Sequence, residues 1–113
     1  MSYHVDRSDN YALITIEAEK LDSNIAPSLK SELVVLNTDG VKNIIIDLTA
    51  TRYCDSSGLS AILVGNRLCK NCEGTFIITG LQSPVKKLIS ISQLDTILTI
   101  TNTLPEATSI LVV

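Results

Sequence analysis

The sequence predicts an α/β fold with a mainly parallel sheet of four to five strands, an antiparallel first strand and about four helices. Strand-like and helix-like segments alternate along most of the chain, an order typical of parallel sheets with right-handed crossovers. Residues 43–48 are apolar almost without alternation, as expected of a central strand covered on both faces. The chain has 113 residues, which is room for one core, so we expect a single domain over residues 1–113.

The first two predicted strands form a hairpin. Residues 12–17 alternate partly between apolar and polar side chains and are rich in β-branched residues, a pattern typical of a strand with one buried face. Residues 3–7 are predicted to be its antiparallel partner, because residues 8–10 between the two segments are turn formers.

A helix is predicted to follow this hairpin. The apolar residues that share one stripe of this helix are Ile25, Leu29, Leu33 and Leu36. We expect Ser23 or Asn24 to cap the helix and Pro27 to lie in its first turn, where a missing N–H costs little. Asp39 and Gly40 are expected to end it.

The second half of the chain continues the alternation. The expected elements are, in order, a loop through Tyr53, a helix over residues 58–69, a strand over residues 75–79, a further helix, and a short strand over residues 97–100. Ser83 is expected to cap the further helix, with Pro84 in its first turn and Lys86 and Lys87 on its solvated face. Thr103 and Glu106 have the spacing of a capping box, so a last helix is expected after them.

Charge and composition exclude several classes of function. The formal net charge is −3 at pH 7 and the chain has no basic run, so we expect neither nucleic-acid binding nor membrane insertion. The longest apolar runs are also far below the roughly 18 residues that a spanning helix needs. With one histidine, no tryptophan and one phenylalanine, the chain is poorly supplied for histidine catalysis, a histidine metal site or base stacking. We therefore expect a binding or switching module without catalytic residues, metal or cofactor.

The cysteines and the N-terminal residues predict a cytoplasmic protein. The first residues form neither a basic nor an apolar signal region. The three cysteines, Cys54, Cys69 and Cys72, are odd in number and close in sequence, which fits reduced thiols. Cys69 and Cys72 have the spacing of a redox pair, but they lie near the C-terminal end of a predicted helix, where the helix dipole opposes thiolate formation. A thiol redox protein is therefore the third hypothesis.

The most informative segment runs from Asp55 through Ser56, Ser57 and Gly58 to Leu59, where a loop turns into a helix. A helix N-terminus exposes unpaired N–H groups and a partial positive charge, so it tolerates a phosphoryl group on Ser56 or Ser57 better than most surfaces. The alternative is that Asp55 and the serines only cap the helix. Gly58 costs about 1 kcal/mol relative to alanine in a helix, which indicates close approach of another backbone or an awkward entry geometry.

This segment resembles the phosphorylation motif of the STAS domains, and among them of the bacterial anti-sigma factor antagonists. Residues 44–48 precede the motif at the family's usual spacing. Residues 21–29 resemble the family's loop and helix after the second strand, and residues 105–107 fit its last helix. The resemblance covers nearly the whole chain and implies a STAS-like fold.

The resemblance implies a phosphorylation switch. Ser57 falls at the family's phosphorylated position, with Ser56 as the alternative, and the partner is a serine kinase that is also an anti-sigma factor. The unphosphorylated protein binds this kinase and frees a sigma factor, phosphorylation releases it, and a phosphatase of the PP2C type resets it. The partner-binding residues implied are Asp22, Ser23, Asn24, Asp55, Ser56, Gly58 and Leu59. Whether the protein also forms a weak homodimer is left open.

Two departures from the family pattern bear on partner choice. Glu19 and Lys20 stand where a glycine is common, and Tyr53 and Cys54 replace a pair that is usually more hydrophobic. The second hypothesis is accordingly a STAS scaffold or ligand-sensing module that binds a partner constitutively, with the serines acting as caps.

The helix after Ser57 offers a docking face. We expect Leu59, Ile62 and Leu63 to face the sheet. On another side of the helix, the apolar residues that either form a surface patch or are simply buried are Ala61, Val64 and Leu68.

Overall fold

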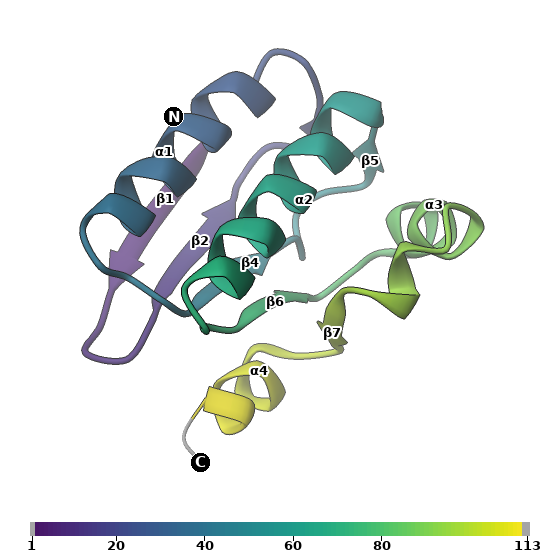
Figure 1. Cartoon of the computed structure of the whole chain (residues 1–113). Helices are drawn as coiled ribbons and strands as arrows, with labels where there is room; N and C mark the ends of the chain where they lie inside the picture. Colours follow the sequence, from purple (N-terminus) through teal and green to yellow (C-terminus); the bar gives the residue numbers. More distant parts are fainter. Residues whose placement is uncertain (1, 112–113) are drawn as a thin grey trace.

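A five-stranded sheet organises residues 2–111, the part of the chain that the structure, a computed structural model, describes (Figure 1). Its strands, in spatial order, are β1 (Tyr3–Arg7), β2 (Ala12–Ile16), β4 (Ile44–Asp47), β6 (Phe76–Thr79) and β7 (Thr99–Thr101). The β1–β2 pair is antiparallel and every other neighbouring pair is parallel. The predicted sheet, including its antiparallel first strand, is confirmed.

Helices cover both faces of this sheet. They are α1 (Ala26–Thr38), α2 (Ser56–Asn71), α3 (Ser83–Ile91) and α4 (Leu104–Leu111). The first three pack on one face and share the larger hydrophobic core with the sheet, whereas α4 packs on the opposite face. In Figure 1, α1 and α2 lie side by side over the strands, and α4 lies apart from them near the C-terminus. None of the helices within residues 2–111 combines the length and the hydropathy that a bilayer crossing requires.

Strand β4 shows why its sequence lacks alternation. Ile44 and Ile46 point into the larger core, and Ile45 points into the smaller core, where it packs with Ile77 and Ala107. All three isoleucines are buried, which confirms the predicted central strand with two covered faces.

A second, two-stranded sheet was not predicted. It consists of β3 (Lys20–Leu21) and β5 (Tyr53–Cys54), which pair in parallel. Each strand has two residues, too few for an alternating pattern to be visible in the sequence. The expectation of a loop through Tyr53 is therefore wrong at its last residue.

The predicted N-terminal cap of α1 is also wrong. Ile25 occupies the cap position, and Ser23 and Asn24 lie exposed ahead of it without capping the helix. The side chain of Asp22 organises this approach, because its Oδ1 accepts a hydrogen bond from the Asn24 amide at 3.0 Å. Pro27 lies in the first turn as predicted.

The last third of the chain differs in detail from the prediction. Gln82, not Ser83, precedes α3, so Ser83 is a helical residue and not the cap. A short 3₁₀ helix, η1 (Leu94–Thr96), follows α3 and delays β7, which begins at Thr99 and not at residue 97. The capping box before α4 is confirmed, because the Glu106 amide donates to Thr103 Oγ1 at 3.3 Å and the Thr103 amide donates to Glu106 Oε1 at 3.1 Å.

Candidate functional site

The small β3–β5 sheet brings two of the predicted binding segments together. Leu21 in β3 lies opposite Cys54 in β5, and the amide of Asp55 donates to the carbonyl of Leu21 at 3.3 Å. Because the two strands run in the same direction, the residues that follow them, Asp22 and Asp55, leave the ladder at the same end. The loop before α1 and the start of α2 are therefore neighbours.

Asp55 is the N-cap residue of α2. Its Oδ1 accepts a hydrogen bond from the Gly58 amide at 3.0 Å, and its carbonyl accepts one from the Leu59 amide at 3.0 Å. The capping alternative is thus right for Asp55 and wrong for Ser56 and Ser57, which are helical residues and not the cap. The helix begins at Ser56, two residues before the predicted start at residue 58, so both serines lie in its first turn.

Gly58 is needed for the contact between α2 and β3. A β-carbon at this position would overlap the carbonyl oxygen of Leu21 and would lie 2.7 Å from Cys54 Sγ and 2.9 Å from Leu21 Cγ. These separations are shorter than van der Waals contact allows, and one of the atoms belongs to a backbone that cannot rotate away. The close backbone approach predicted from this glycine is confirmed.

The two serines differ in exposure. Ser56 is exposed, whereas Ser57 is half-buried. Both stand among the first helical residues of α2, where backbone N–H groups have no partner within the helix and the helix dipole is positive. The site therefore places the hydroxyl groups of Ser56 and Ser57 at the positive end of the dipole of a 16-residue helix.

The acidic residues on the other side of the site also have structural roles. Asp22 is half-buried, and its carbonyl accepts hydrogen bonds from the amides of Ile25 and Ala26 at 3.0 and 2.8 Å. Asp55 is half-buried as well, and the β3–β5 pairing puts both aspartates at the same end of the small sheet. The nearby Arg52 does not join this pair of carboxylates but makes an exposed ion pair with Glu19 at 3.5 Å.

Part of the helix α2 face that was considered for docking is buried in the domain. Ile62 is fully buried as predicted, but Ala61 is fully buried too, so its assignment to a surface patch is wrong. Leu59 and Leu68 are half-buried and pack against the larger core. The alternative of a simply buried helix is right for Ala61 and Leu68. Val64 and Leu63 are half-buried and are not among the residues packed against the larger core, so the expectation that Leu63 faces the sheet is not confirmed.

The cysteines do not form a reactive pair. Cys54 and Cys69 are buried free thiols, and burial raises the pKa of each to about 12. Neighbouring Asp55 raises the pKa of Cys54 further, and Cys72 does so for Cys69. A raised pKa leaves almost no thiolate near neutral pH, which argues against the redox hypothesis. Within residues 2–111, no group of three or more potential metal-ligating side chains is found.

The sequence was compared with models of known protein families. The model of the STAS domain matches residues 3–107 of the chain. The chain belongs to the STAS domain family. The motif from Asp55 to Leu59, the capped start of α2 and the loop at Asp22 are thus parts of a STAS domain.

Solved structures agree with this fold. The STAS domain is similar to an anti-sigma-factor antagonist domain protein from Planctomyces limnophilus, with a TM-score of 0.88, 16% identity and 98% of both chains covered. It is also similar to an anti-sigma factor antagonist from Mycobacterium paratuberculosis, with a TM-score of 0.85, 20% identity and coverage of 96% of this chain and 92% of the other. The phosphorylated form of the Bacillus cell fate determinant SpoIIAA matches with a TM-score of 0.75, 19% identity and coverage of 95% and 96%. At these identities the similarities establish the fold.

Proposed function

We propose that this STAS domain is an anti-sigma factor antagonist, a non-catalytic switch that acts in the cytoplasm through protein binding. In its unphosphorylated form it binds an anti-sigma serine kinase, and phosphorylation of Ser57 releases it. The observation that carries the proposal is the position of Ser57 in the first turn of α2, two residues after the capping Asp55, at the helix end that the β3–β5 pairing brings next to the loop at Asp22.

The chemistry of this position supports a reversible modification. A phosphoserine carries about −1.5 to −2 charges at neutral pH, and the free N–H groups and positive dipole of a helix N-terminus stabilise such a group. Phosphorylation at Ser57 therefore does not require the domain to unfold. The cap of this turn is the bond from the Gly58 amide to Asp55, which uses neither serine hydroxyl.

The same charge acts against a bound partner. Asp22 and Asp55 already place two carboxylates beside the site, and a partner that packs over them removes water from all three groups. Adding a phosphate there costs association energy through like-charge repulsion and desolvation. We propose that this penalty releases the kinase and that a phosphatase of the PP2C type restores binding.

The proposed binding surface surrounds the first turn of α2. It consists of the exposed or half-buried residues of the loop and the turn, which are Asp22, Ser23, Asn24, Asp55, Ser56 and Leu59. Gly58 belongs to the site in a different way, because it is buried and sets the distance between α2 and β3.

A phosphorylation assay tests the proposal. The full chain is incubated with Mg-ATP and each small ATPase-fold serine kinase encoded in the same genome, and the modified residue is located by mass spectrometry. We expect phosphate on Ser57, with none on the Ser57→Ala variant and undiminished modification of Ser56→Ala. Complex formation is measured in parallel, with ADP and with ATP.

The outcomes separate the proposal from its alternatives. A stable complex in both nucleotide states without phosphate on either serine would favour a constitutive STAS scaffold. Phosphate on Ser56 alone would move the switch by one residue. Neither phosphate nor complex with any of these kinases would refute the proposal.

A further inference from the structure

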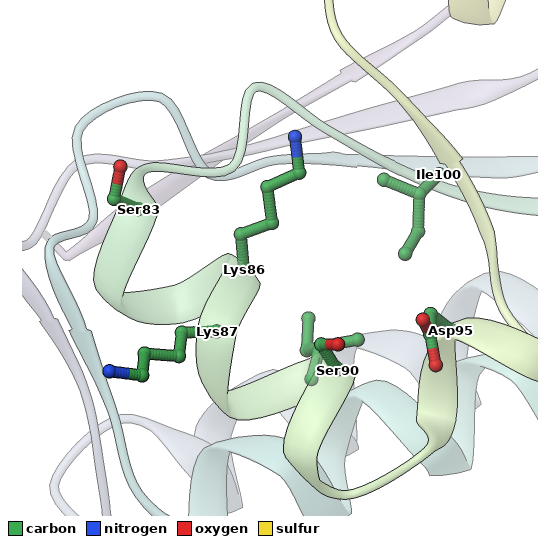
Figure 2. Close-up of a pocket in the computed structure, with 7 residues that line it drawn as sticks. Ser83, Lys86, Lys87, Ser90, Asp95 and Ile100 are labelled. Carbon is green, nitrogen blue, oxygen red and sulfur yellow. The ribbon is translucent and has the colours of Figure 1, made fainter.

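A half-open cavity of about 480 Å³ lies between α3, η1 and β7, and none of its lining residues belongs to the site around Ser57. Helix α3 supplies Ser83, Lys86 and Ser90 at helical spacing along one stripe. Asp95 of η1 and Ile100 of β7 close the cavity from the other side (Figure 2). Its volume falls within the range of roughly 300–1,000 Å³ that small-molecule sites occupy.

The backbone after α3 explains how Asp95 comes to face the helix. Gln93 has a left-handed conformation, with φ of 60°, which is uncommon for a residue other than glycine. Its amide donates to the carbonyl of Ser90 at 3.0 Å, so the chain reverses at once and η1 returns along the helix. This turn places a carboxylate and an ammonium group on opposite sides of the cavity.

Both charged groups are unpaired within the residues that the structure describes. The ion pairs found there join His4 to Asp6, Arg7 to Asp39 and Arg52 to Glu19, and involve neither Lys86 nor Asp95. Figure 2 shows the Lys86 side chain extending along the cavity toward the strand of Ile100, whereas Lys87 points away from Asp95.

The cavity also has apolar lining residues. Ile89 of α3 and Ile100 of β7 line the cavity and contribute to the larger core, and Ile89 is almost fully buried, so Ile100 supplies most of the apolar surface that a ligand can reach. Lys87 also lines the cavity, but its ammonium group points away from Asp95. The ligand therefore meets Lys86, Asp95 and an apolar surface at Ile100. A ligand with one charge would leave the other side chain without a partner, whereas a ligand with both charges would satisfy the two.

We propose that this cavity binds a small zwitterion with a hydrocarbon body, of the class of the aliphatic α-amino acids. The ligand's carboxylate pairs with the ammonium group of Lys86, its ammonium pairs with the carboxylate of Asp95, and its hydrocarbon chain packs against Ile100. The hydroxyl of Ser90 lines the same space and is available as a further hydrogen-bond partner. This site goes beyond the proposed switch and does not depend on it.

The test compares three ligands of similar shape. L-Leucine carries both charges, 4-methylpentanoate carries only the carboxylate, and 3-methylbutylamine carries only the ammonium. We titrate each into the isotopically labelled full chain and follow amide resonances by NMR, without any kinase or nucleotide. Leucine is expected to bind saturably with a Kd on the order of 1 mM, as suits a small ligand in a half-open cavity. The expected shifts are confined to residues 83–101, and each single-charge analogue binds at least about tenfold more weakly.

Two variants and two matched controls assign the charges. Lys86→Gln and Asp95→Asn should each weaken leucine binding at least about tenfold. Both side chains are exposed, so neither change should alter the fold, which urea unfolding checks. Lys70→Gln and Asp9→Asn make the same charge changes at exposed positions outside the cavity and should leave leucine binding unchanged.

The result that overturns the proposal is equally specific. Absence of saturable leucine binding, or shifts centred outside residues 83–101, would exclude the site. Binding of either single-charge analogue as tightly as leucine would exclude recognition of a zwitterion.

Discussion

The carbonyl oxygen of Leu21 lies where a β-carbon on Gly58 would have to stand. Helix α2 thus packs so closely on strand β3 at the turn that carries Ser57 that the Leu21 backbone and the Leu21 and Cys54 side chains leave no room for a β-carbon. Any residue larger than glycine would push the helix away from the strand. The loop at Asp22 and the cap at Asp55 would then separate as well, because β3 and β5 position them together.

Gly58→Ala should therefore destabilise the domain, although alanine is the better helix former. The gain in helix propensity is about 1 kcal/mol, whereas forced overpacking costs about 1–3 kcal/mol and here involves a backbone atom. We expect a net loss in the free energy of unfolding, measured with urea. Ser31→Ala, at an exposed position of α1, is the control and should be neutral or slightly stabilising. A Gly58→Ala variant as stable as the unmodified protein would contradict the packing role.

The cap residue allows structural and electrostatic roles to be separated. Asp55→Ala removes the acceptor of the Gly58 amide and should lower the free energy of unfolding by about 1 kcal/mol. Asp55→Asn keeps a capping oxygen but loses the charge, so its stability should stay close to that of the unmodified domain. Equal losses for the two variants in urea unfolding would mean that the carboxylate stabilises the domain by charge and not by capping.

Substitutions at Ser57 test the charge mechanism. Ser57→Asp should weaken binding to the kinase at least about tenfold, or about 1.4 kcal/mol, because it adds a third carboxylate beside Asp22 and Asp55. Ser57→Ala should bind normally. Isothermal titration calorimetry measures both affinities. An acidic residue in the first turn of a helix does not destabilise it, so unfolding should not confound the comparison. Identical affinities would rule the charge mechanism out.

The buried thiols should be slow to react and should make stability depend on alkaline pH. Cys54 and Cys69 have pKa values of about 12 in the folded domain against an ordinary 9.0, so iodoacetamide at pH 8 should label Cys72 first. Between pH 9 and pH 12 the unfolded chain loses thiol protons that the folded chain retains, so the free energy of unfolding falls as pH rises. Replacing Cys54 with alanine should make this decline shallower. Rapid labelling of Cys54 or Cys69 in the folded protein at pH 8 would contradict their burial.

Much of the fold could be predicted because its strands have strong patterns. The triple isoleucine of β4 predicted a strand with two buried faces, and both cores use it. The capping box at Thr103 and Glu106 is a local signal, and the structure confirms it. The local capping signal at Ser23 and Asn24 was misleading. The amides of the residues before and at the start of α1 donate to Asp22 instead, and these hydrogen bonds set the course of the chain there.

Part of the local geometry of the candidate site could be predicted from the sequence. The cap at Asp55 and the close contact at Gly58 are confirmed, whereas the role of Ser57 stays a prediction. The sequence could not reveal what the glycine contacts, because the β3–β5 ladder joins segments more than thirty residues apart through two residues each. Nor could any local pattern show the cavity beside Lys86, since the turn at Gln93 that closes it has no glycine to mark it.

The placement of α4 has a consequence for synthesis on the ribosome. Of the described helices, α4 alone covers the face that contains Ile45 and Ile77, and it follows every strand of the sheet in the chain. At roughly 5–20 residues per second, about one to five seconds separate the emergence of β6 from that of α4. During that interval the hydrophobic face that contains Ile45 and Ile77 is exposed to solvent. A chaperone that binds exposed hydrophobic segments could bind the nascent chain until α4 covers this face.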